Sequence, residues 1–119
     1  MKKEIVAIVT TESAEFKTFF AGLVKKYHAH CDKEGYTIRN YHFFTEGKKY
    51  IKVCTGTDAV SKVGSSYCFI DKTNGNVLKP ASWSSPAKHA RGNIFAADNG
   101  LDCCGPYGVA YLRGGELLK

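Results

Sequence analysis

The sequence predicts an α+β fold, in which a mostly antiparallel sheet of about five strands packs against one long helix. Three observations support this fold: apolar residues recur at helical spacing in residues 13–35, two pairs of β-rich segments flank short turn sequences, and the C-terminal half is rich in loops. A chain of 119 residues, 44% of them hydrophobic, is long enough to bury one core. A single domain spanning residues 1–119 is therefore expected.

The first elements are a strand and a long helix. Residues 4–10, "EIVAIVT", are apolar and β-branched. Because Glu4 interrupts the apolar run and no clear small-residue cleavage site follows, they predict a strand and not a signal peptide. Residues 13–35 predict the helix, which ends at Gly35. Its apolar side chains recur at Phe16, Phe19, Phe20, Leu23, Val24, Tyr27 and Cys31.

Two hairpins are predicted next. Residues 36–44 and 49–54 flank the sequence "TEGK", and residues 65–72 and 76–80 flank "TNG". The polar segment between the hairpins, residues 55–64, is predicted to be a surface loop.

A short helix is predicted after the second hairpin. Ser85 suits an N-cap, Pro86 suits the first helical position, and Gly92 suits the end. The remainder of the chain is rich in turns, and long irregular segments in a compact domain are usually functional. The expected helix, "PAKHAR", carries Lys88, His89 and Arg91 on or near its surface.

Charge and cysteine content narrow the classes of partner. A net charge of +6 favours anionic partners such as nucleic acid, nucleotides or phosphates. The five cysteines are odd in number and form no CxxC pair, so they are expected to be reduced, buried small residues of a cytosolic protein. No apolar run approaches the roughly 18 residues of a membrane span.

Catalytic and metal-binding signatures do not occur. The chain has no HExxH, GxSxG, Walker or GxGxxG sequence. His28 and His30 are two positions apart and cannot share one helix face, so they do not form a metal pair. Cys103 or Cys104 could pair with His89 as a nucleophile, but no local sequence supports it. Neither an enzyme nor a cofactor is expected.

The segment of residues 79–95, "KPASWSSPAKHARGNIF", is the strongest candidate for a binding site. It holds the only tryptophan and no acidic residue. Trp83 could stack on a base, and Asn93 could contact an adenine edge. Lys88 and Arg91 could contact phosphate. A loop that folds back would bring Trp83 and Asn93 into one cavity.

Structural roles remain open for the same residues. Trp83 could be a core anchor or a contact between subunits. Asn93 could serve a turn, and His89 could be a plain surface residue. A second candidate is "GPYGVAYLRGG", in which glycines admit a ligand and Arg113 supplies a phosphate contact; it could equally be a terminal hairpin with an exposed arginine.

Residues 65–114 carry a resemblance to a known family. The sequences "YCFIDKTNGNVLKPASWSSPAKHARGNIF" and "GPYGVAYLRG" resemble small bacteriophage proteins. Among these, the chain is similar to the Thoeris anti-defence family of signal sponges. The resemblance implies a non-enzymatic protein that sequesters cyclic ADP-ribose isomers. It also implies a homo-oligomer with pockets at subunit interfaces and, in some members, a separate site for cyclic oligonucleotides.

The resemblance assigns roles by motif. Trp83 matches the aromatic residue that stacks on adenine, Asn93 matches a polar contact ten positions later, and Arg113 matches a phosphate-binding arginine. The family's other basic contact precedes "YCFID", where this chain has Lys62 and no arginine. This departure puts the oligonucleotide site in doubt.

The expected function is therefore a cytoplasmic sponge for cyclic nucleotide signals in an infected bacterial host. A small basic nucleic-acid-binding phage protein is the main alternative. A structural or virion-associated protein, and a hydrolase of the same ligand, are further alternatives.

Overall fold

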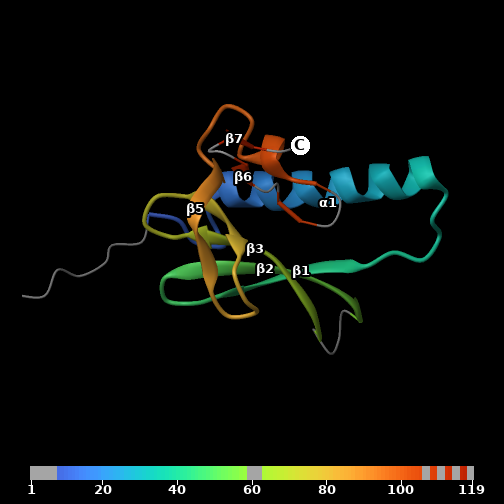
Figure 1. The fold of residues 1–119 in the computed structure, drawn as a ribbon, viewed down its shortest axis with the longest axis horizontal. Helices are drawn as coiled ribbons and strands as arrows, with labels where there is room; N and C mark the ends of the chain where they lie inside the picture. Colours follow the sequence, from blue (N-terminus) through green and yellow to red (C-terminus); the bar gives the residue numbers. More distant parts are fainter. Residues whose placement is uncertain (1–7, 59–62, 106–107, 110–111, 114–115, 118–119) are drawn as a thin grey trace, which may run out of the picture.

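The computed structural model describes residues 8–58, 63–105, 108–109, 112–113 and 116–117. One long helix lies across one face of a five-stranded antiparallel sheet with strand order β1-β2-β3-β4-β5, so the predicted α+β fold is confirmed (Figure 1). The elements are α1 (Ala14–Glu34), β1 (Tyr41–Glu46), β2 (Tyr50–Asp58), β3 (Val63–Asp71), β4 (Asn76–Pro80), β5 (Pro86–Asn93), η1 (Leu101–Cys103), β6 (Leu112–Arg113) and β7 (Glu116–Leu117).

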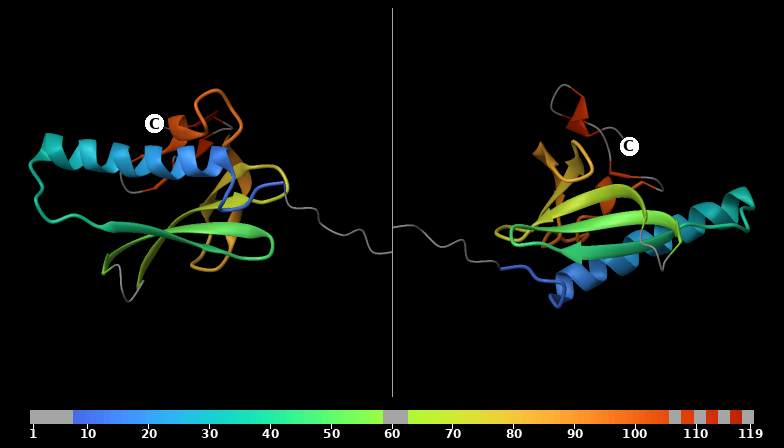
Figure 2. Two further views of the ribbon diagram at one scale, coloured as in Figure 1. Left: turned by 180° about the vertical axis from the view of Figure 1, so that it is seen from behind. Right: turned by 90° about the horizontal axis from the view of Figure 1, so that it is seen from below.

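Helix α1 follows the predicted pattern closely. Its N-cap residue is Ser13, and Gly35 ends it in the left-handed region at φ 76°, where glycine has no steric penalty. The C-terminal end of the helix extends beyond the sheet, and a connection returns from there to β1 (Figure 2). The face turned toward the sheet buries Phe16, Phe19, Leu23, Tyr27 and Cys31.

The core lies between α1 and the sheet. On β2, Ile51 and Val53 point into it, and alternation along the strand sends Tyr50 and Lys52 to the opposite face. All five cysteines are free and buried, as the sequence predicted. Burial raises the pKa of the Cys68 thiol well above its usual value, which keeps this thiol protonated and unreactive.

Two predicted element boundaries are wrong, and a third prediction falls mostly outside the described residues. Of the predicted strand at residues 4–10, only residues 8–10 are described, and they form no strand. Residues 36–40 belong to the connection, because β1 begins at Tyr41. The predicted loop at 55–64 instead contains the ends of β2 and β3, which pair through Gly56 and Gly64.

The predicted short helix at residues 86–91 is also wrong, because this segment is strand β5. It pairs antiparallel with β4, whose outer edge would otherwise lack a partner. Pro86 suits the first residue of an edge strand as well as it suits a helix start. Ser85 does not cap a helix; its carbonyl accepts hydrogen bonds from the amides of Ala81 and Ser82 and closes the hairpin. Gly92 has a packing role, because a Cβ there would lie 3.1 Å from the Cys103 sulfur.

Among the described residues, no helix combines the length and apolarity needed to cross a membrane.

Candidate functional site

The loop between β4 and β5, residues 81–85, folds over the sheet face opposite α1. The Ser66 hydroxyl on β3 donates a hydrogen bond of 2.8 Å to the Trp83 carbonyl. The Lys52 ammonium on β2 lies 3.2 Å from the centroid of the Trp83 ring, which is a cation–π contact. Trp83 is nevertheless 50% exposed, so within this chain it is not a core anchor. Half of the Trp83 surface therefore remains accessible to a ligand.

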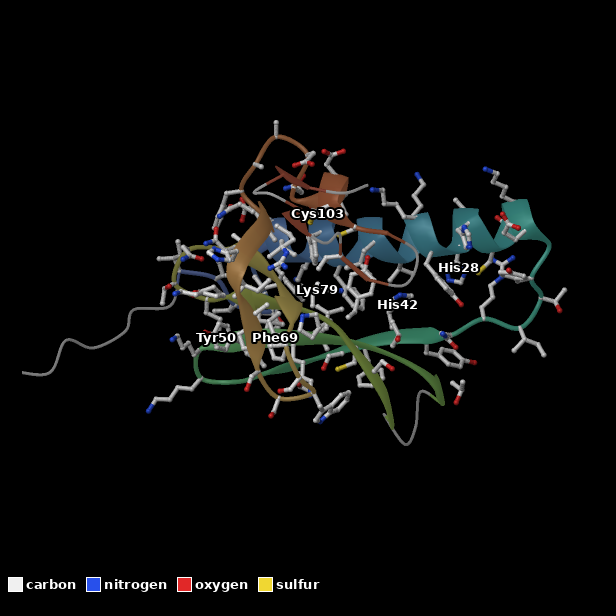
Figure 3. All side chains as sticks on the ribbon, in the orientation of Figure 1. His28, His42, Tyr50, Phe69, Lys79 and Cys103 are labelled. Carbon is white, nitrogen blue, oxygen red and sulfur yellow. The ribbon has the colours of Figure 1, made fainter. Side chains whose placement is uncertain are left out.

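A hollow of about 260 Å³ lies beside this loop, and we name it the lysine hollow. The rings of Tyr50 and Phe69 meet edge to face in it, with centroids 5.9 Å apart (Figure 3). The Lys49 ammonium lies 5.3 Å from the centroid of the Tyr50 ring. The residues that line the hollow are Thr45, Gly47, Lys48, Lys49, Tyr50, Lys52, Phe69 and Ser84.

The lysine hollow is electropositive. Three lysines line it, and no acidic residue is among its described lining residues. Glu46 lies next to Gly47 but is bound elsewhere: its carboxylate accepts hydrogen bonds from Lys72 Nζ at 2.7 Å and Thr11 Oγ1 at 2.7 Å. These hydrogen bonds from Lys72 and Thr11 lower the pKa of Glu46 to about 2, so its carboxylate is charged and bound to them near pH 7. The hollow therefore keeps its positive charge for an anionic ligand.

Asn93 lies at the other end of the β4–β5 hairpin from Trp83. The pairs Pro80–Pro86 and Asn76–Asn93 mark these two ends, so the structure does not bring Trp83 and Asn93 together within one chain. The Asn93 amide donates to the Asn74 carbonyl at 2.8 Å and to Asn76 Oδ1 at 2.9 Å. Its oxygen accepts from the Phe95 amide. This geometry agrees with the alternative that Asn93 serves a turn.

The other predicted contact residues are dispersed. Lys88 is exposed on β5, and Arg91 on the same strand is half-buried. Arg91 Nη1 donates to the His89 carbonyl. Arg113 falls in β6, but its side chain lies outside the described part of the structure. Lys62 lies outside the described residues altogether.

The lysines of the hollow were missed by the sequence reasoning. A signal for them exists in β2, where Tyr50 and Lys52 alternate with Ile51 and Val53. This period of two places Lys52 beside an aromatic residue on the face opposite the core. Nothing in the local sequence, however, indicates that Trp83 comes to rest on Lys52 from a distant loop.

The two cysteines near the C-terminal end, Cys103 and Cys104, are buried. Cys103 is 3% exposed, and its thiol donates to the Gly100 carbonyl at 3.1 Å. Within the described part of the chain, no group of three or more His, Cys, Asp and Glu side chains could hold a metal ion. The lysine hollow and Trp83 together are suited to binding an anionic aromatic ligand by stacking and charge.

Comparison with known proteins places the chain in a family but assigns no activity. Residues 1–110 match the model of a family described as a family of unknown function (DUF7717). No curated protein and no solved structure matches the chain significantly. Because the family match extends over most of its length, the chain belongs to the DUF7717 family of unknown function.

Proposed function

We propose that the protein binds and sequesters cyclic nucleotide signals, such as cyclic ADP-ribose isomers and cyclic oligonucleotides, without cleaving them. In this proposal it is a phage anti-defence protein that acts in the cytoplasm of the infected host. One observation carries the proposal: the half-exposed Trp83 indole, held against the Lys52 ammonium, borders a hollow lined by three lysines.

Stacking and charge supply the affinity in this proposal. A base stacked on the exposed part of Trp83 contributes about 1–3 kcal/mol. The phosphates then extend toward Lys48, Lys49 and Lys52. Lysine presents a compact charge with rotatable donors, so it tolerates phosphates in several orientations. Such a site suits signals that differ in linkage but share a base and phosphates.

The size of the lysine hollow also bears on assembly. Its volume of about 260 Å³ is below the roughly 300–1,000 Å³ of pockets that enclose a whole ligand. The hollow is therefore expected to hold one nucleotide moiety. The rest of the ligand would lie over Trp83 and be covered by a second copy of the chain, so the proposal includes a homo-oligomer.

The test is recovery of the bound molecule. Purified protein is mixed with cyclic ADP-ribose isomers and cyclic oligonucleotides, washed, and heat-denatured, and the released molecules are identified by mass spectrometry. Recovery of an intact ligand supports sequestration. Recovery of a cleaved ligand would establish a hydrolase instead. If nothing is retained, the cyclic nucleotide proposal is wrong.

A second candidate function is binding of single-stranded nucleic acid, because the lysine hollow and Trp83 lie on an open sheet face. A polymer contacts several lysines at once, so its affinity falls steeply with salt concentration. A single cyclic ligand releases fewer counterions. Titrations of an oligonucleotide and of a cyclic nucleotide at several salt concentrations separate the two functions. The ligand that binds more tightly at intracellular ionic strength is expected to be the physiological one.

A further inference from the structure

A second and larger cavity, which we name the His42 cavity, opens between α1 and β1. Its volume is about 460 Å³, within the range of pockets that enclose a small ligand. Phe20 and Val24 of α1 form an apolar wall, and Tyr41 of β1 adds an aromatic ring. The polar part of the lining consists of His28, Thr37, Arg39, Asn40 and His42. None of the residues lining this cavity also lines the lysine hollow.

His42 is the unusual member of this cavity. Both of its ring nitrogens are buried, and neither has a hydrogen-bond partner among the described residues. The ring instead lies edge to face with two tyrosine rings, with centroid distances of 5.0 Å to Tyr27 and 6.1 Å to Tyr67. Burial of an unpaired polar group costs about 1–3 kcal/mol, so an apolar residue would serve a purely structural role better.

The protonation states in the cavity follow from its contacts. The Arg39 guanidinium can only donate, so in its 3.0 Å contact with His28 the Nδ1 atom must be the acceptor. Burial, with a smaller contribution from His28, lowers the pKa of His42 to about 4, so the His42 ring is neutral near pH 7. Arg39 is paired with Asp32.

The cavity thus offers polar contacts without an unpaired charge. A neutral imidazole presents one donor and one acceptor, and His42 has both unused among the described residues. The aromatic and apolar walls favour a flat ring. An anion gains little here, because the Arg39 charge is already neutralised by Asp32. The ligand should therefore be uncharged, planar and able to both donate and accept hydrogen bonds.

We infer that the His42 cavity is a second binding site, separate from the lysine hollow, that takes an uncharged planar heterocycle of the nucleobase or nucleoside class. The edge of such a ring carries donors and acceptors, so it can pair with one nitrogen of His42 after the imidazole turns toward the cavity, since both nitrogens are otherwise buried. The cavity volume accommodates a base together with its sugar.

The experiment uses the full chain and four nucleosides, adenosine, guanosine, cytidine and uridine, with their free bases. Two readouts are taken: the imidazole NMR signals of His42 and His28, and the melting temperature. At least one probe is expected to shift both histidine signals and to raise the melting temperature. The matching nucleoside monophosphate should bind this site no more tightly than the nucleoside.

The decisive variant is His42→Phe, which removes the buried unpaired atoms while keeping a ring of similar size. It should melt at or above the temperature of the unmodified protein, yet bind the nucleoside at least about tenfold more weakly. His42→Gln keeps one donor and one acceptor and should restore most of the affinity. Trp83→Ala serves as the control and should leave the nucleoside response unchanged.

Two results would overturn the inference. One is that no nucleoside or base shifts the His42 signals at millimolar concentration. The other is that His42→Phe binds the probe as tightly as the unmodified protein. Neither result bears on the lysine hollow, whose ligand is tested separately by the cyclic nucleotide experiment.

Discussion

The lysine hollow and the His42 cavity lie on opposite faces of the same sheet, and they differ in charge and in volume. The hollow is the smaller of the two and faces away from α1, with three lysines beside the half-exposed Trp83. The cavity lies under α1, and its polar groups are neutral or already paired. Charges near water keep their ionised form and attract anions from a distance, whereas a buried imidazole loses its proton and selects by shape and hydrogen bonding.

One hairpin contributes to both regions. The β1–β2 hairpin supplies Tyr41 and His42 to the cavity and Lys48, Lys49 and Lys52 to the hollow. Tyr41 and His42 lie at the start of β1, whereas Lys48 and Lys49 lie in the turn that leads to β2, so different parts of one hairpin serve two different chemistries. Substitutions within this hairpin should therefore affect one site without the other, and this expectation can be tested.

The largest effect is expected from Lys52→Glu. This substitution removes the ammonium that contacts Trp83 and places a negative charge where the phosphates are proposed to bind. Affinity for the cyclic nucleotide should fall about 100-fold or more, because a charge-assisted contact worth about 1.5–3 kcal/mol is replaced by repulsion. Isothermal titration calorimetry measures this change, and nucleoside binding at the His42 cavity should be unaltered.

Lys25→Glu is the matched control for that experiment. Lys25 is exposed on α1 and lines neither site, so its substitution changes the net charge of the protein by the same amount. If both variants weaken the cyclic nucleotide equally, the attraction comes from overall charge and not from the lysine hollow.

The next largest effect is expected from Trp83→Ala. Loss of stacking should weaken cyclic nucleotide binding about 10- to 100-fold, which corresponds to about 1–3 kcal/mol. The melting temperature should change little, because half of the Trp83 surface is already exposed. Trp83→Phe keeps a ring and should retain part of the affinity. Phe95→Ala, which removes another exposed aromatic ring, is the control; equal affinity in Trp83→Ala and Phe95→Ala would rule out stacking.

The elements that the sequence predicted well are those governed by local patterns. The helix was predicted because its apolar residues recur at helical spacing up to Gly35, and the β3–β4 hairpin because "TNG" forms a tight turn. The segment 86–91 was misjudged because its proline and glycine are compatible with either a helix or an edge strand. The choice is made by a distant partner, the free edge of β4, which no local window contains.

The candidate sites, too, depend on contacts between segments that are distant in the sequence. Trp83 was identified from composition alone, since it is the only tryptophan in a segment without acids. Its contact with Lys52 depends on how the β4–β5 loop folds back, and its separation from Asn93 depends on β5 being an extended strand. The local sequence does not distinguish His42 as a binding residue, because a histidine in a strand is ordinary. Only the packing of α1 over β1 shows that both ring nitrogens are buried without a partner among the described residues.

The smallest effect is a pH dependence of stability that distinguishes the two regions. Burial lowers the pKa of His42 from 6.5 to about 4. Between these values the unfolded chain binds a proton that the folded chain excludes, so His42 makes the protein less stable as the pH falls from about 6.5 toward about 4. Glu46, with its pKa lowered to about 2, loses its stabilising contribution only as the pH falls below about 4.5.

The melting temperature of the unmodified protein should therefore fall by a few degrees more than that of His42→Phe between about pH 7 and about pH 5. Trp83→Ala should follow the unmodified protein, because its substitution lies on the other face of the sheet. Parallel melting curves for the unmodified protein and His42→Phe across this range would mean that His42 is protonated in the folded state. The His42 cavity would then carry a positive charge, and it would no longer differ in kind from the lysine hollow.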